Sequence, residues 1–216
     1  MKYFKGQLEL WMLTKMAMLF FIIGLSFIIL NVSNIEKGAL CKEQAMSTAR
    51  LITSNINQVT TDSTEDEVLV YKFQPTLSAG SEKTDRYLVN LSVKELGEGA
   101  GSRFQVSVKV SAINERECQA TSTVFLDRNR IEPPINFQST PYSPPREING
   151  EDGRTLTLLP SNSKVSERSR FLVISKCTSK IAFGSMPHLT FIDCGGDVLD
   201  PTTCGGEASF NVCAAG

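Results

Sequence analysis

The sequence has a single histidine, His188, and this scarcity excludes several kinds of site. A metal centre built on a pair of histidines is excluded, and a Ser-His-Asp triad would depend on this one residue. His188 follows Pro187 in a short stretch that is typical of a turn.

The motifs of common enzyme classes are also missing. No G-x-S-x-G motif surrounds a serine, and the sequence has no Walker loop or glycine-rich dinucleotide turn. Ser161 and Lys164 match S-x-x-K, but this spacing arises easily by chance in a serine-rich polar loop. We therefore predict no enzymatic activity and no cofactor.

An excess of basic charge is absent too. The chain of 216 residues has 22 Lys and Arg against 23 Asp and Glu, which gives a formal net charge of -1 at pH 7. Since little positive charge is left to neutralise phosphates, we expect no nucleic-acid partner.

Closely spaced cysteine pairs, which zinc sites favour, do not occur in the sequence. The carboxylates Asp193, Asp197 and Asp200 fit no calcium-loop spacing, and we expect them to lie in a solvated turn. The sequence therefore predicts no metal site.

A long apolar run does occur, near the N-terminus. From Met16 to Leu30 small residues interrupt apolar side chains only twice, and extension back to Leu10 gives the ~20 residues that a helix needs to cross ~30 Å of hydrocarbon. The preceding lysines predict, by the positive-inside rule, a cytoplasmic N-terminus and an extracellular C-terminal region. These are Lys2, Lys5 and Lys15.

A cleaved secretory signal is the alternative interpretation of this run. The run is longer than a usual signal core, and no A-x-A site follows it closely. A lipoprotein site is disfavoured because the large Leu40 precedes Cys41. We therefore expect the helix to be retained in the cell membrane, with the cysteines in an oxidising compartment.

After this run a helical pattern resumes with a different character. Apolar residues recur at intervals of three and four between residues 41 and 59, which predicts an amphipathic helix buried against its own domain. This stripe consists of Cys41, Ala45, Ala49, Ile52, Ile56 and Val59.

The period then changes to two, which indicates β-strands. Alternation over 87–94 and 104–111, joined by a glycine-rich turn, predicts an antiparallel hairpin with one buried face. Further strands are expected near Val68 and over 121–126. Residues 129–153 are rich in proline and predict an exposed linker, and short apolar runs follow it.

We therefore predict an α+β protein with these parts: a leader peptide (1–6), a transmembrane helix (7–33), an amphipathic helix (34–61), an antiparallel β region (66–128), a Pro-rich linker (129–153) and a Cys-rich β region (154–216). The β regions form a disulfide-containing extracellular head.

Six cysteines beyond a membrane helix predict disulfides, for which fifteen connectivities exist. We favour bridges within the tail among Cys177, Cys194, Cys204 and Cys213. Cys41 and Cys118 are then left to tie the helix to the first sheet.

Two sequons are present, at Asn31 and Asn90. Asn31 is expected too close to the bilayer for glycosylation. The strand alternation places Asn90 on the exposed face of the hairpin, so Asn90 is the candidate.

The N-terminus combines these features in a recognisable order. Lys5 and Gly6 end a short basic leader, Gln7 begins the hydrophobic helix, an amphipathic helix continues it, and a β-rich head follows. In this order the chain resembles archaeal type IV pilin-like proteins with class III signal peptides. A looser similarity is the Pro-containing run 74–80 before the Tyr-led strand 87–91.

The resemblance implies that a prepilin-type peptidase cuts after Gly6 on the cytoplasmic side. It also implies that the helix packs with other pilin-like subunits in a surface filament. Glu9 would then be the carboxylate that pairs with a neighbour's N-terminal amine, although it stands earlier than the family's glutamate. Leu8 and Trp11 also depart from the family's pattern.

The sequence thus predicts a pilin-like surface subunit whose head serves filament assembly or adhesion. The main alternative is an uncleaved, single-pass, membrane-anchored extracellular binding domain that does not enter a filament. A membrane-anchored hydrolase that uses His188 is a more distant one.

Overall fold

The structure is a computed structural model and describes residues 3–63, 66–79, 82–83, 86–97, 102–113, 118–140, 147–150, 153–164, 167–178 and 186–196. For 3–10, 34, 37, 78–79, 82–83, 139–140, 147–150 and 153 it describes the backbone only. The chain divides into two compact units, Met1–Leu40 and Cys41–Gly216.

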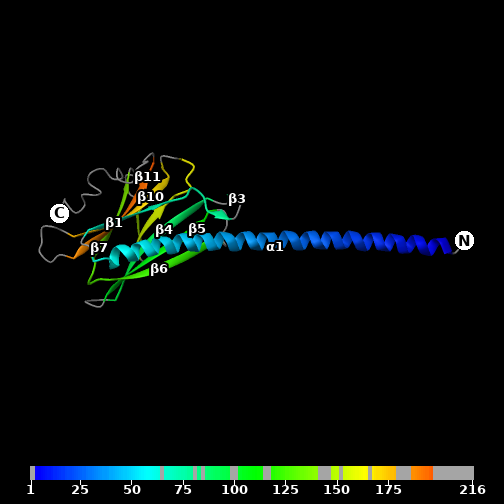
Figure 1. Ribbon diagram of the computed structural model, residues 1–216, viewed down its shortest axis with the longest axis horizontal. Helices are drawn as coiled ribbons and strands as arrows, with labels where there is room; N and C mark the ends of the chain where they lie inside the picture. The colour runs from blue at the N-terminus through cyan, green and yellow to red at the C-terminus, as the bar shows by residue number, and fades with distance from the viewer. Residues whose placement is uncertain are drawn as a thin grey trace. The chain divides into compact units, whose positions relative to one another are not determined.

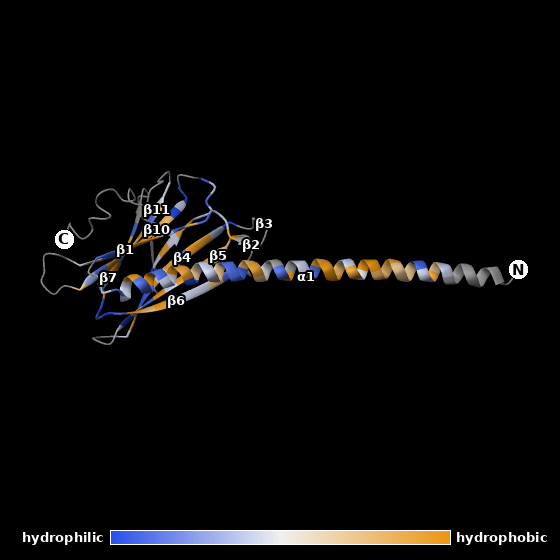
Figure 2. Cartoon of the chain, viewed as in Figure 1, coloured by the Kyte–Doolittle hydropathy of each residue, from blue (hydrophilic) through white to orange (hydrophobic). Residues whose placement is uncertain are grey.

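A single α-helix, α1 (Tyr3–Thr61), contributes to both units. In the first unit the described large apolar side chains, from Trp11 onward, are exposed, and Figure 2 shows an apolar stretch in the middle of this segment. Within the second unit the helix is amphipathic, as the spacing predicted. All six residues of the predicted stripe are 0–1% exposed.

One of the two larger sheets has five antiparallel strands. Its strand order is β6-β5-β4-β9-β8. The strands are β4 (Tyr87–Leu96), β5 (Arg103–Ala112), β6 (Gln119–Asp127), β8 (Glu147–Gly150) and β9 (Gly153–Leu158). The predicted hairpin is β4–β5, in register from Tyr87↔Ala112 to Leu96↔Arg103. In Figure 1, β4, β5 and β6 lie beside this part of the helix, and the Thr53 and Ser122 hydroxyls are hydrogen-bonded at 2.8 Å.

A four-stranded sheet has the order β1-β10-β11-β7. Its strands are β1 (Glu67–Lys72), β7 (Glu132–Thr140), β10 (Ser169–Thr178) and β11 (Pro187–Gly195). β1 pairs with β10 and β10 with β11 in antiparallel fashion, whereas β11 and β7 are parallel. A two-stranded ladder joins β2 (Ser78–Ala79) to β3 (Glu82–Lys83).

Residues 129–153 differ from the expected exposed linker, because β7 and β8 form there. Proline cannot donate to a ladder, but β7 is an edge strand, where proline is tolerated. Ile135 and Phe137 are buried, and Phe137 packs on Phe191 with ring centroids 5.8 Å apart. The apolar alternation after the prolines therefore makes a strand.

The two predicted β regions also interleave. β1 comes from the first region and pairs with β10 of the second, while β9 of the second pairs with β4 of the first. The α1 stripe and one face of each large sheet belong to a single hydrophobic cluster. The second unit is therefore one α+β body rather than two β domains in series.

Candidate functional site

The exposed apolar segment of α1 is the first candidate. The helical stretch Trp11–Thr61 includes a segment that is long and apolar enough to cross a membrane. Leu13, Phe20 and Phe27 are 72%, 68% and 68% exposed, respectively. So much exposed apolar surface on one segment is typical of a site for lipid or for another protein.

Two polar residues of this segment, Lys15 and Asn31, have partners within the helix. The Lys15 ammonium lies 5.5 Å from the centroid of the Trp11 ring, which is within the range of a cation–π contact. The Asn31 side-chain amide donates to the Phe27 carbonyl at 2.9 Å. Both contacts lower the cost of placing these residues next to apolar surroundings.

The predicted leader lies at the start of the same helix. Lys5, Gly6, Gln7 and Glu9 fall within the bounds of α1, but their side chains lie outside the described residues. Cleavage after Gly6 and the role of Glu9 in assembly therefore stay predictions.

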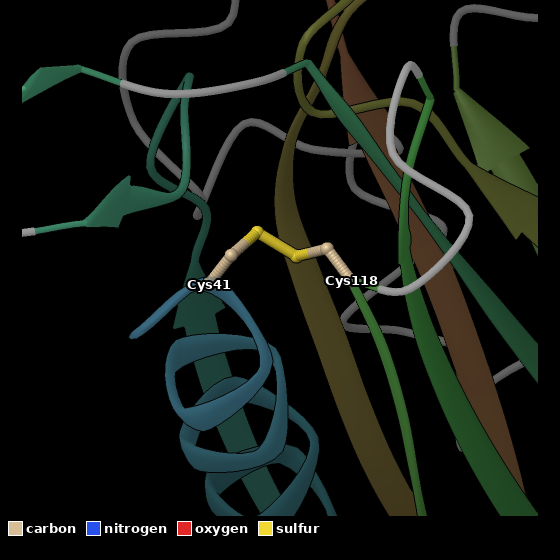
Figure 3. The surroundings of a disulfide bond; sticks show 2 residues. All are labelled: Cys41 and Cys118. Atoms are coloured by element: carbon tan, nitrogen blue, oxygen red, sulfur yellow. A yellow bond between two sulfur atoms is a disulfide. The ribbon is translucent and has the colours of Figure 1, made fainter. Parts of the chain in front are cut away.

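A disulfide between Cys41 and Cys118 ties the second unit's part of α1 to the sheet (Figure 3). Cys118 directly precedes β6, and its carbonyl accepts a hydrogen bond from Ala112 N at 2.9 Å. The Cα atoms of the two cysteines are 5.5 Å apart, and both side chains are buried. This bond confirms the predicted pairing.

The C-terminal end of α1 is held by the four-stranded sheet. Lys176 on β10 is buried, and its ammonium donates to the Asp62 carbonyl at 2.7 Å. A cation at this end of a helix satisfies an open carbonyl and complements the helix dipole. Thr60 and Thr61 donate to the Ile56 and Asn57 carbonyls. Lys176 was not identified from the sequence, because a lysine inside a strand is usually solvated.

Tyr87 joins three segments that lie far apart in the sequence. Its hydroxyl donates to the Gln74 carbonyl at 2.7 Å, and its backbone N–H donates to Ser161 Oγ at 3.1 Å. The Ser161 hydroxyl in turn donates to the Pro75 carbonyl. The Pro-containing run and the Tyr-led strand noted in the sequence are thus joined directly by a hydrogen bond.

These bonds also give Ser161 and Lys164 structural roles. Ser161 is committed to the contacts around Tyr87, and the Lys164 ammonium pairs with the Glu167 carboxylate at 3.1 Å. Burial raises the pKa of the Tyr87 phenol well above its ordinary value, and the nearby Tyr71 raises it further. Tyr87 is therefore a neutral hydrogen-bond donor at physiological pH.

A pocket of about 300 Å³ opens between α1 and these tyrosines. Its lining is uncharged and carries hydroxyls and amides. The residues are Gln44, Ser47, Thr48, Leu51, Tyr71, Gln74, Thr76, Leu77 and Tyr87. Burial raises the pKa of Tyr71, and a hydrogen bond with Thr48 partly offsets this increase. The described lining of the pocket provides neutral hydrogen-bonding groups.

The tail cysteines are described only in part. Cys177 and Cys194 are both disulfide-bonded. They stand at opposite ends of the β10–β11 ladder, opposite His188 and Phe171 respectively, and so do not bond to each other. Cys204 and Cys213, which the prediction of bridges within the tail requires, lie outside the described residues.

Two polar residues lie in strands rather than in the expected turns. His188 is on β11, and its Nε2 is 3.3 Å from Glu132 Oε2. The strand can include Pro187 because proline is tolerated at the first position of a strand. Asp193 is fully buried on the same strand and not part of a solvated turn. Among the described residues, no group of three or more His, Cys, Asp and Glu is arranged to hold a metal ion.

The glycosylation candidate is less open than the alternation suggested. Asn90 lies on the central strand β4 and is half-buried, because β5 and β9 flank it on both sides. Its Oδ1 accepts a hydrogen bond from the Thr157 hydroxyl at 3.1 Å. Glycosylation at Asn90 stays a prediction.

The chain was also compared with known proteins. No protein-family model, curated protein or solved structure matches it.

Proposed function

We propose that this protein is a pilin-like surface subunit, anchored by its N-terminal helix and presenting a β-rich, disulfide-tied head outside the cell. The observation that carries the proposal is that the two parts of α1 differ in burial. Its first part exposes apolar side chains, and its second part buries a stripe in the core of the head.

Firm attachment of the helix to the head supports this function. Mechanical load on an anchor or a filament passes through the segment that joins it to the head. In this chain the Cys41–Cys118 bond and the contact of Lys176 with Asp62 hold the two ends of the buried helical part. A helix fixed at both ends suits a subunit that is held by its N-terminus.

Packing of apolar helices against one another is the proposed mode of assembly. Leader removal exposes a new amine at Gln7, and Glu9 on a neighbouring subunit provides a carboxylate to pair with it. Such pairing offsets the cost of burying both charges. The contact of Lys15 with the Trp11 ring reduces a similar cost in the same segment.

The position of the mature N-terminus tests the proposal. We expect mass spectrometry of the protein, made in a host with a prepilin-type peptidase, to find chains that begin at Gln7. Gly6→Val should block this processing, because the added side chain prevents close approach of the backbone to the peptidase. Membrane insertion should be unchanged, since the apolar run is intact.

A matched control is Gly38→Val, which places the same side chain on the same helix far from the cleavage site. A Cβ at Gly38 would meet no atom within 4 Å. This variant should be processed normally. If wild-type chains keep residues 1–6, the pilin proposal fails and the uncleaved, membrane-anchored binding domain replaces it.

A further inference from the structure

A second pocket, of about 240 Å³, lies on the other side of the segment that lines the first. Residues 71–77 separate the two: Tyr71, Gln74, Thr76 and Leu77 face the first pocket, whereas Lys72, Phe73 and Pro75 face the second. The second pocket differs from the first in charge. Its described lining contains three cations and no carboxylate, and we call it the cationic pocket.

The three cations come from two strands and a turn. Lys72 is exposed at the end of β1 and is the register partner of Phe171. Arg168 precedes β10, and its Nε donates to the Asn162 carbonyl at 3.1 Å, which fixes the guanidinium beside the turn. Arg170 is the third. Lys72 and Arg168 thus place two positive charges on the lining, which favours binding of an anion.

The backbone at Arg170 is irregular. The β10–β11 register shifts between Ser169 and Phe171, which places a bulge at Arg170. The Arg170 carbonyl accepts a hydrogen bond from Phe73 N at 2.8 Å, so the bulge is held against the segment after β1. Bulges occur often beside binding sites, because they redirect a side chain.

Four of the other five lining residues are apolar. Phe73 and Phe171 are buried, and Pro75 and Pro160 complete the apolar walls. Ser169 is buried as well, and its hydroxyl accepts a hydrogen bond from Leu159 N at 2.9 Å. A pocket with apolar walls and cations suits a small ring that has an apolar face and an anionic group.

We propose that the cationic pocket binds an acidic saccharide unit, that is, one sugar ring that carries a carboxylate, sulfate or phosphate. Lys72 and Arg168 hold the oxyanion, and the C–H face of the ring lies against the prolines and Phe73. The volume limits the site to about one ring, either free or as one unit of a longer polymer. This inference does not depend on leader cleavage or filament assembly.

Binding can be measured on the full chain in a nonionic detergent without a sugar head group. The probes are glucuronate, glucose 6-sulfate and glucose 6-phosphate, with neutral glucose as the uncharged comparison, titrated by saturation-transfer NMR. We expect at least one acid to bind about ten-fold more tightly than glucose, the size of a charge-assisted hydrogen bond. Added NaCl should weaken this binding, because it screens exposed charge.

Variants then place the site. Lys72→Gln and Arg168→Gln should each weaken binding of the acid several-fold, with an unchanged thermal melt confirming the fold. Lys109→Gln removes an exposed lysine from β5, outside the cationic pocket, and should bind like the wild type. Equal affinity for glucose and the acids, no binding of any probe, or an equal loss in Lys109→Gln would each overturn the proposal.

Discussion

At the scale of single residues, two neighbours on α1 have opposite environments. Ile52 is 0% exposed, whereas Leu51 is 52% exposed. Both are apolar, so their types alone do not distinguish them. The spacing of Ile52 from Ala45, Ala49 and Ile56 does, because these positions share one face of the helix.

Ile52→Asp should destabilise the head by on the order of 4 kcal/mol, since it places a carboxylate without a built-in partner in the core. Leu51→Asp is the control at the exposed position and should change stability by less than about 1 kcal/mol. Thermal unfolding of the full chain in detergent, followed by the β-sheet signal in circular dichroism, measures both. Similar melting temperatures for the two variants would contradict burial of the stripe.

Tyr87 gives a prediction that depends on pH. Its pKa is raised from the ordinary value of 10.0, so folding favours the neutral phenol. The stability that the group contributes is therefore complete below about pH 10 and is lost as pH rises beyond it. Tyr87→Phe also removes the hydrogen bond to Gln74 and should cost about 1 kcal/mol at pH 7.

Urea unfolding between pH 7 and pH 11 separates the two effects. The wild type should lose stability steeply above about pH 10, and Tyr87→Phe should lose less over the same range. Parallel curves for the two proteins would show that Tyr87 does not contribute to the alkaline loss of stability.

At the scale of elements, the Cys41–Cys118 bond joins positions 77 residues apart. Closing a loop of this length lowers the conformational entropy of the unfolded chain and so stabilises the folded state by about 4 kcal/mol. The double variant Cys41→Ala/Cys118→Ala should lose roughly that amount in urea unfolding. The double change avoids an unpaired thiol, and a loss near zero would show that the bond does not stabilise the head.

The sequence predicted the elements with strong periodicity. The stripe of α1 and the β4–β5 hairpin were identified because spacing of three to four, or of two, needs no knowledge of distant partners. β7 was missed because Pro133 and Pro134 disfavour a strand, and only its position beside β11 at a sheet edge makes the strand acceptable.

The sites too were predicted only in part, because some of them depend on residues that are distant in the sequence. The disulfide partners Cys41 and Cys118 were predicted from the oxidising compartment and the grouping of the other cysteines. The cationic pocket was not predicted, because Lys72 and the two arginines lie almost 100 residues apart in sequence and meet only through the β1–β10 pairing. Lys176 was missed because a lysine inside a strand is usually solvated, and its partner Asp62 lies far away in the sequence.

At the scale of the whole molecule, Gly24 tests whether the apolar segment packs against other copies. A Cβ added there would meet no atom within 4 Å in the isolated chain. Small residues allow close approach of helices in membranes and filaments. Gly24→Leu should therefore leave membrane insertion unchanged and reduce assembly into filaments, with Gly24→Ala intermediate.

Fractionation of membranes and sheared surface material measures the two outcomes. Assembly of Gly24→Leu at the wild-type level would mean that no neighbour packs at this position. The anchored binding domain predicts no sheared filament for any variant, so it is distinguished from a failure at Gly24 alone.

The pairing of β1 with β10 has a consequence for the timing of folding. Glu67 on β1 and Lys176 on β10 are register partners, so the ladder cannot form until β10 has been synthesised. At about 5–20 residues per second, the ribosome takes on the order of 5–20 s to make the intervening ~100 residues. During that interval β1 cannot pair with β10, and the Asp62 carbonyl at the end of α1 lacks the hydrogen bond from Lys176. A nascent chain caught at that stage would be a target for chaperones and proteases, and one that terminates before β10 would not fold into the head at all.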